Sequence, residues 1–251
     1  MPTETATSLT TILPPPADSN RQAQTRLRLL EAAAREFAEH GFHHSTVRDI
    51  CKRANANVAA VNYHFGDKEG LYSATLKHWI SYALEAYPLL MGVAADAPAV
   101  DRLRGFVRGT LHRMLCEASS GWHGQLMARE MVEPTAAFDE LVSVSLKPMA
   151  DLLHGIVRDI VGPAIPDPAV RTCALSVIGQ CCFYRHAREV ITRMYGADAY
   201  TPASIELIAD HITRFSLAGF TACTQLPAVA NCPGIDASEQ SLTQALASLA
   251  V

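Results

Sequence analysis

The stretch "ANANVAAVNYHFGDKEGLY", residues 54–72, decides how the front of this chain folds. Its first four residues break a helical pattern, and Val58, Val61 and Phe65 then resume that pattern for two turns. The stretch has little hydrophobic bulk but many side chains that form hydrogen bonds, at Asn57, Asn62, Tyr63, His64 and Lys68. Such a segment is either a solvated turn or a short helix whose polar groups serve a partner.

Helical spacing surrounds this stretch on both sides. In "TRLRLLEAAAREFAEHG" (25–41) the apolar residues Leu27, Leu30, Ala34 and Phe37 share one helix face, and Gly41 is the expected end of the helix. A second helix follows Ser45 and Thr46, either of which can cap it, with apolar residues at Val47, Ile50, Cys51 and Ala54. A fourth helix, capped by Asp67, carries Tyr72, Leu76, Trp79 and Ala83 on one face.

Three short helices within residues 21–65, with a four-residue break between the second and third, predict a helix-turn-helix. The two short helices would pack through Val47, Ile50, Cys51, Ala54, Val58 and Val61. The free face of the third would carry Ala59, Ala60, Asn62 and Tyr63, and small residues there allow entry into a major groove about 12 Å wide. The low bulk is therefore what insertion into DNA requires.

The same residues resemble the amino-terminal domain of the tetracycline-repressor (TetR) family of transcriptional regulators over residues 22–82. The family's motifs occur in order as "EAAAREFAEHGF" (31–42), "TVRDI" (46–50), "YHF" (63–65) and "DKEGLY" (67–72). The wording "NVAAVNYHFGDKEGLY", with "ARE" and "EPT" within 128–135, resembles a CerR-type subgroup. The family usually has Gly where this chain has Asn55, and Asn tolerates the left-handed conformation that the turn needs.

The resemblance implies DNA-binding roles by position. Thr46 and Arg48 would lie near the backbone, while Tyr63, His64 and Lys68 would meet phosphates, Lys68 together with the amides that begin the fourth helix. The face that reads bases would be Asn57, Val58, Ala59, Ala60 and Asn62. Three alternatives stay open: Val58, Ala59 and Ala60 only fill space, Tyr63 and His64 only pack on the fourth helix, and Lys68 is only a solvated charge.

Charge is distributed unevenly along the chain, whose formal net charge is −4. Residues 21–70 hold eight Lys or Arg and six Asp or Glu, a net charge of +2, which leaves −6 for the remainder. A mildly basic head on an acidic body agrees with a DNA-binding amino-terminal domain. The seven cysteines form no CxxC pair, which favours reduced thiols in a cytoplasmic protein over a disulfide framework.

The pattern of elements predicts an all-α chain in four parts. Residues 1–20, rich in Ser, Thr and Pro and lacking Lys, Arg and any long apolar run, indicate a disordered arm with no signal peptide. The DNA-binding domain would span 21–82, with the helix-turn-helix at about 45–64, and a helical ligand-binding and dimerisation domain would span 83–225. Residues 226–251 would form a tail.

The expected helices of the larger domain lie at about 99–118, 122–132, 134–162, 168–193 and 202–222, with a kink at Pro148. The resemblance implies a ligand pocket and a dimer interface there. The apolar faces of the last two helices predict a four-helix bundle between two copies, through Cys173, Val177, Cys181, Ile205, Ile208, Ile212 and Phe215. The alternative is that these residues are internal core.

A pocket needs apolar surroundings with a few polar groups, a combination found before Pro134. The candidate lining is Trp122, Met127, Arg129, Glu130, Met131 and, from a later helix, Tyr184. The alternative readings are a structural ion pair between Arg129 and Glu130 and a Met and aromatic stripe that belongs to the core. The ligand's chemistry stays open.

The function that follows is a regulator, expected to be a repressor, that binds a palindromic DNA operator as a homodimer and is released by a small-molecule inducer. No nucleotide-binding, nucleophile-elbow or metalloprotease motif is present, so we expect no enzyme and no cofactor. We also expect no metal site, because Gly41 separates the histidines of "HGFHH" (40–44). The rival reading is a helical adaptor that lacks DNA binding.

Overall fold

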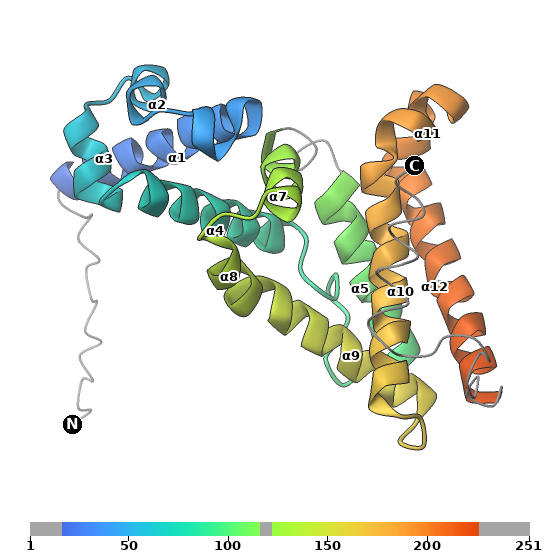
Figure 1. Cartoon of the computed structure of the whole chain (residues 1–251). Coiled ribbons are helices and arrows are strands. Elements are labelled where there is room, and N and C mark those ends of the chain that lie inside the picture. The colour runs from blue at the N-terminus through green and yellow to red at the C-terminus, as the bar shows by residue number, and fades with distance from the viewer. Residues whose placement is uncertain (1–16, 116–121, 226–251) are drawn as a thin grey trace, which may run out of the picture. The chain divides into compact units, whose positions relative to one another are not determined.

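The computed structural model describes residues 17–115 and 122–225, and throughout these ranges the chain forms helices and turns without a strand (Figure 1). This confirms the all-α class. The helices are α1 (Ala17–His44), α2 (Val47–Ala54), α3 (Val58–Phe65), α4 (Lys68–Ala86), α5 (Ala99–Leu115), α7 (Trp122–Val132), α8 (Phe138–Leu141), η1 (Val142–Leu146), α9 (Lys147–Val161), α10 (Asp167–His186), α11 (Arg188–Tyr195), η2 (Ala197–Tyr200) and α12 (Pro202–Gln225). None of the helices in these ranges is both long and apolar enough to cross a membrane.

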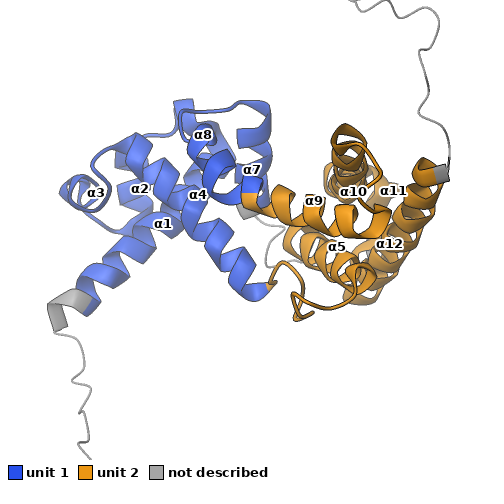
Figure 2. Cartoon of the chain, turned by 90° about the horizontal axis from the view of Figure 1, so that it is seen from below, with its two compact units in different colours: residues 1–86, 117–147 blue, residues 87–116, 148–251 orange. Residues whose placement is uncertain are grey.

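The chain forms two compact units that interleave in sequence (Figure 2). Unit 1 combines residues 1–86 with 117–147, and unit 2 combines 87–116 with 148–251. Unit 1 therefore holds α7 and α8 in addition to the expected helix-turn-helix. Helix α1 begins at Ala17, within the expected amino-terminal arm, and the rest of that arm and the expected tail at 226–251 lie outside the described residues.

The core of unit 1 consists of small and medium side chains from α1 to α4 and α7. Its largest fully buried members include Leu29, Leu30, Phe37, Ile50, Leu71 and Leu126. Leu27, expected on the buried face of α1, is instead 43% exposed. The buried stripe of α1 runs through Leu29, Leu30 and Ala33, because these side chains point to the helices that pack on it and Leu27 does not.

Gly41, where the sequence predicts the end of the helix, has the non-helical angles φ 77° and ψ 167°, and helical residues continue beyond it to His44. A side chain there would also be crowded, since a Cβ would lie 2.9 Å from Nη1 of Arg129. The buried hydroxyl of Ser45 donates to the carbonyl oxygens of Glu36 (3.1 Å) and Gly41 (2.7 Å). Ser45 thus closes the end of α1 and leaves the capping of α2 to Thr46.

A buried carboxylate joins α4 to α7 within unit 1. Glu130 is fully buried, and its Oε2 accepts a 2.6 Å hydrogen bond from the Tyr72 hydroxyl. Its Oε1 accepts from the amide and the hydroxyl of Thr135, each at 2.9 Å. Burial, followed by the bond to Glu130, raises the pKa of Tyr72 far above its usual range, so the phenol remains the donor.

Unit 2 contains a separate core formed by α5, α9, α10, η2 and α12. The largest buried side chains are Leu103, Phe106, Leu111, Leu115, Leu153 and Ile156. Helices α10 and α12 lie side by side (Figure 1). Between them, Nε2 of Gln180 donates to Oγ of Ser216 at 3.2 Å.

Two of the expected long helices are divided in the structure. The segment expected as one helix at 134–162 begins only at Phe138, and its turn Val142–Leu146 is a π-helix directly before Pro148. Proline lacks an N–H and clashes with the carbonyl four residues earlier, so the helical hydrogen-bond pattern widens to a π-turn there. The kink expected at Pro148 stays a prediction. The segment expected at 168–193 divides at Ala187, where φ is −87° and ψ is 8°.

Candidate nucleic-acid interface

Helix α3 has one side packed against the core of unit 1 and the other side exposed to solvent. Val61 is fully buried against the core of unit 1, and Ala60 is half-buried against the same core. Val58, Ala59, Asn62 and Tyr63 are exposed, with Val58 at 42% and Tyr63 at 72%. Val58 therefore does not take the packing role expected for it, and Ala60 takes that role in part.

The turn that presents α3 is fixed by two asparagines and a threonine. The hydroxyl oxygen of Thr46 accepts the Asp49 amide at 3.1 Å, which caps α2. Asn55 ends α2 in the left-handed conformation, with φ 47° and ψ 54°, as expected for a residue in place of glycine. Oδ1 of Asn57 accepts the Ala59 amide at 3.0 Å, so Asn57 caps α3 with this oxygen, while its NH₂ group donates no hydrogen bond within the described residues that would compete with a partner.

Aromatic and basic side chains gather where α3 ends and α4 begins. The rings of Tyr63 and His64 meet edge to face with centroids 4.9 Å apart. Nζ of Lys68 lies 4.5 Å from the centroid of the Phe42 ring, so a cation–π contact holds the ammonium group of this lysine over that ring at the start of α4. Asp67 caps α4, as expected, by accepting the Gly70 amide at 2.7 Å.

A charged cluster ties α2 to α1 behind this surface. Nη2 of Arg53 donates to Glu36 at 3.1 Å and to Glu39 at 2.7 Å, and His40 lies 3.1 Å from Glu36. The hydrogen bond from Arg53 lowers the pKa of Glu39. Ligand atoms of Glu36, Glu39 and His40 lie close enough to share a cation, but the guanidinium of Arg53 already supplies the positive charge. The cluster is therefore an ion-pair network that fixes α2.

The described residues among those expected to line a ligand pocket do not line one common cavity. Glu130 is bonded to Tyr72 and Thr135, whereas Nη2 of Arg129 donates to the Glu39 carbonyl at 3.3 Å, so each has partners of its own. Met127 packs against the core of unit 1, and Met131 is 53% exposed. Tyr184 packs in the core of unit 2. The side chain of Trp122 lies outside the described residues.

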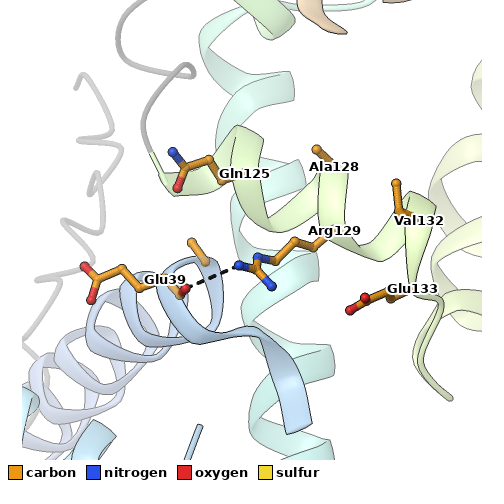
Figure 3. A pocket seen from close by; sticks show the side chains of 7 residues that line it. Glu39, Gln125, Ala128, Arg129, Val132 and Glu133 are labelled. Carbon is orange, nitrogen blue, oxygen red and sulfur yellow. Dashed lines mark hydrogen bonds between the residues drawn. The ribbon is translucent and has the colours of Figure 1, made fainter. Parts of the chain in front are cut away.

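Arg129 instead lines an open hollow of about 570 Å³ between α1 and α7 (Figure 3). The lining residues are Ala38, Glu39, Gln125, Ala128, Arg129, Val132 and Glu133. Figure 3 shows the Arg129 side chain reaching from α7 toward α1. Of the expected pocket residues, Arg129 is the one that lines this hollow.

The residues expected at a dimer interface lie mainly inside unit 2. Cys173, Val177, Cys181, Ile205 and Ile212 are each at most 7% exposed, and Ile208 is partly buried against them. Phe215 alone of the seven is well exposed, at 62%. The exposed apolar residues of the same helices are others: Leu175 and Phe183 on α10 and Leu207 on α12, at 63%, 60% and 72%. Sequence reasoning missed them because both helices are apolar on more than one face.

Two family models match this chain in the same order as its parts. Residues 29–75 match the model for bacterial regulatory proteins of the tetR family, and residues 99–220 match the C-terminal domain of the HTH-type transcriptional dual regulator CecR. The part of the chain that follows the helix-turn-helix, expected to be of a CerR-type subgroup, is thus similar to the C-terminal domain of CecR. CecR of Shigella flexneri is 27% identical over 207 residues, which cover 79% of this chain and 92% of that protein.

Further similarities concern the amino-terminal part and the fold. BetI of Burkholderia mallei is 35% identical over 82 residues, which are 33% of this chain and 42% of that regulator. A putative transcriptional regulator from Pseudomonas aeruginosa PAO1 shares the fold with a TM-score of 0.58 and 22% identity, covering 83% of this chain and 94% of that one. AibR, solved with isovaleryl coenzyme A and operator DNA, shares the fold with a TM-score of 0.55 and 17% sequence identity. The match covers 76% of this chain and 97% of the AibR chain.

Proposed function

Because this chain belongs to the TetR family of DNA-binding transcriptional regulators and is not an enzyme, we propose how it acts. Two copies bind a palindromic operator, each placing α3 in the major groove, and repress the neighbouring promoter in the cytoplasm. A small molecule then releases the dimer from DNA. The observation that carries this proposal is the exposed face of α3, made of Val58, Ala59, Asn62 and Tyr63 around the buried anchor Val61.

The exposed face of α3 suits contact with bases. Its methyl-sized and branched side chains permit close approach, and Asn62 supplies the amide that can pair with an adenine edge. Tyr63, His64 and Lys68 follow at the helix end, where phosphates would lie, and the exposed side chains Thr46 and Arg48 open α2 beside them. Phosphate contacts position a protein on the duplex, whereas base contacts specify the sequence.

Dimerisation would use the exposed apolar face of α10 and α12. Leu175, Phe183, Leu207 and Phe215 lie on it, and Gly179 and Gly219 have open space where a side chain would be. Small residues between large apolar ones allow helices of two copies to approach closely. Two reading helices one turn of DNA apart would then recognise a palindrome, which one short helix binds too weakly.

Release by a ligand would act through α7. Helix α7 packs on α1 and α4, which also pack against α3. Glu130 of α7 accepts a hydrogen bond from Tyr72 of α4. AibR, which shares the fold, was solved with an acyl coenzyme A and DNA together. A ligand that binds one position of α7 better than another shifts the DNA-binding equilibrium by that difference, typically about 1–3 kcal/mol.

The proposal is tested by selecting bound fragments from random duplex DNA and measuring their affinity over a salt series. We expect a palindromic consensus and an affinity that falls steeply with salt. Lys68→Ala should weaken binding to all sequences and reduce the salt slope by about 1. Arg193→Ala, which removes the same charge from exposed α11, serves as the control and should leave the slope unchanged. Absence of any preferred duplex at low salt would instead favour an adaptor.

A further inference from the structure

Helices α10 and α12 of unit 2 run antiparallel (Figure 1), and one hydrogen bond between them defines their register. Nε2 of Gln180 donates to Oγ of Ser216 at 3.2 Å across the seam. One turn further on, Tyr184 of α10 and Ile212 of α12 pack in the same core. Positions whose numbers change by equal and opposite amounts along the two helices therefore lie opposite each other.

Two turns from the Gln180–Ser216 pair, in the other direction, the same register places Cys173 opposite Cys223. The Cys223 thiol lies near enough to that of Cys173 to raise its pKa, as this register requires. Cys173 is buried in the core at 7% exposure, whereas Cys223 is exposed in the last turn of α12. One cysteine is therefore exposed to solvent while its neighbour across the helix pair is shielded.

We propose that Cys173 and Cys223 form an oxidisable dithiol, which hydrogen peroxide converts into an intrachain disulfide between α10 and α12. The Cys223 thiolate attacks one peroxide oxygen, the O–O bond breaks, and hydroxide leaves to become water. The Cys173 sulfur then attacks the resulting sulfenic acid, releases its proton, and displaces a second water as the S–S bond forms. Two thiols lose two electrons and the peroxide gains them.

The order of these steps follows from the surroundings of each sulfur. Burial raises the pKa of Cys173 to about 11, so this thiol is a poor first nucleophile at neutral pH. Cys223 is exposed and reacts first, and the position of Cys173 opposite it lets Cys173 trap the sulfenic acid before further oxidation. Among the other cysteines described, Cys51 and Cys181 are buried, and Cys182 is half-buried.

The test uses the full-length protein, reduced, freed of reductant and treated with limiting hydrogen peroxide. After alkylation of the remaining thiols, peptide mass spectrometry should find the peptides of Cys173 and Cys223 linked, with the loss of two hydrogens. Oxidised protein should run as a monomer on a non-reducing gel and melt at a higher temperature than reduced protein, because the cross-link restricts the unfolded chain. Reductant should reverse both changes.

Cys173→Ser and Cys223→Ser should each abolish the link, whereas Cys182→Ser, a matched change on α10, should preserve it. Circular dichroism of each variant confirms that it is folded before the comparison is made. The proposal is overturned if Cys223 pairs with Cys232 or with Cys223 of a second copy, which gives a different peptide or a dimer band. It is equally overturned if Cys223 proceeds to sulfinic acid while Cys173 stays free.

Discussion

Asn55 occupies the turn of the helix-turn-helix with a φ of 47°, in the region that favours glycine. Its amide donates to the end of α2, and the next amide, of Ala56, donates to the Cys51 carbonyl at 2.9 Å. The short polar side chain of asparagine makes this conformation less costly than it is for alanine. A single residue thus sets the angle at which α3 leaves α2.

We predict that Asn55→Ala lowers the free energy of unfolding by about 1 kcal/mol, because alanine is strained at positive φ. The free energy of unfolding of Asn55→Gly should equal or slightly exceed that of the parent protein, since glycine meets no such strain. Urea unfolding followed by circular dichroism gives both values. Equal stability of the two variants would show that the turn does not depend on the left-handed conformation.

The buried carboxylate of Glu130 is a second feature at this scale. Tyr72→Phe removes the hydroxyl that donates to Oε2 of Glu130 at 2.6 Å, so this buried oxygen loses that hydrogen bond. We expect a loss of about 1–3 kcal/mol in the free energy of unfolding. Tyr63→Phe, at a tyrosine that is 72% exposed in the same unit, is the matched control for stability and should change it little. If both variants unfold alike, the bond contributes nothing.

At the scale of elements, α3 is only eight residues long and depends on its cap and its anchor. Short helices are marginal in water without tertiary packing, so the Asn57 cap and the buried Val61 are what keep α3 formed. The resemblance assigns Asn57 to the reading of bases, and the structure adds a structural role for its side-chain oxygen. The two roles use different atoms and can be separated.

Asn57→Ala should lower the free energy of unfolding by about 1 kcal/mol, whereas Asn57→Ser, which keeps a capping oxygen, should lose much less. If the asparagine NH₂ group also meets a base, both variants should bind a selected operator more weakly than the parent. Thermal unfolding and fluorescence anisotropy with labelled DNA measure the two effects. Unchanged affinity of Asn57→Ser would limit this residue to capping.

At the scale of the whole molecule, the proposed dimer raises the question of which surface would join its two copies. The apolar face of α10 and α12 exposes Leu175, Phe183, Leu207 and Phe215 on a protomer whose core is already complete beneath it. An apolar surface rimmed by polar residues marks an interaction site more often than a solvated face. Its two open glycines would let a second pair of helices approach.

We predict that Phe215→Glu converts the dimer to a monomer and lowers operator affinity at least tenfold, because a charge would be buried at the interface. Met194→Glu, on α11 at 64% exposure, is the control and should leave the molar mass unchanged. Light scattering coupled to gel filtration measures the molar mass, and anisotropy measures the affinity. A Phe215→Glu protein that stays dimeric would place the interface elsewhere.

The sequence by itself determined the all-α class, the break at Gly41, the capping by Asp67 and the short third helix, because caps, glycines and apolar spacing are local signals. Only the tertiary structure decided that Ser45 closes α1 while Thr46 caps α2, since both residues qualify locally. It likewise decided that Glu130 bonds Tyr72 and that α10 and α12 bury one apolar face and expose another. Those outcomes depend on which segments meet in space, and helical periodicity shows that a face is apolar without showing what covers it.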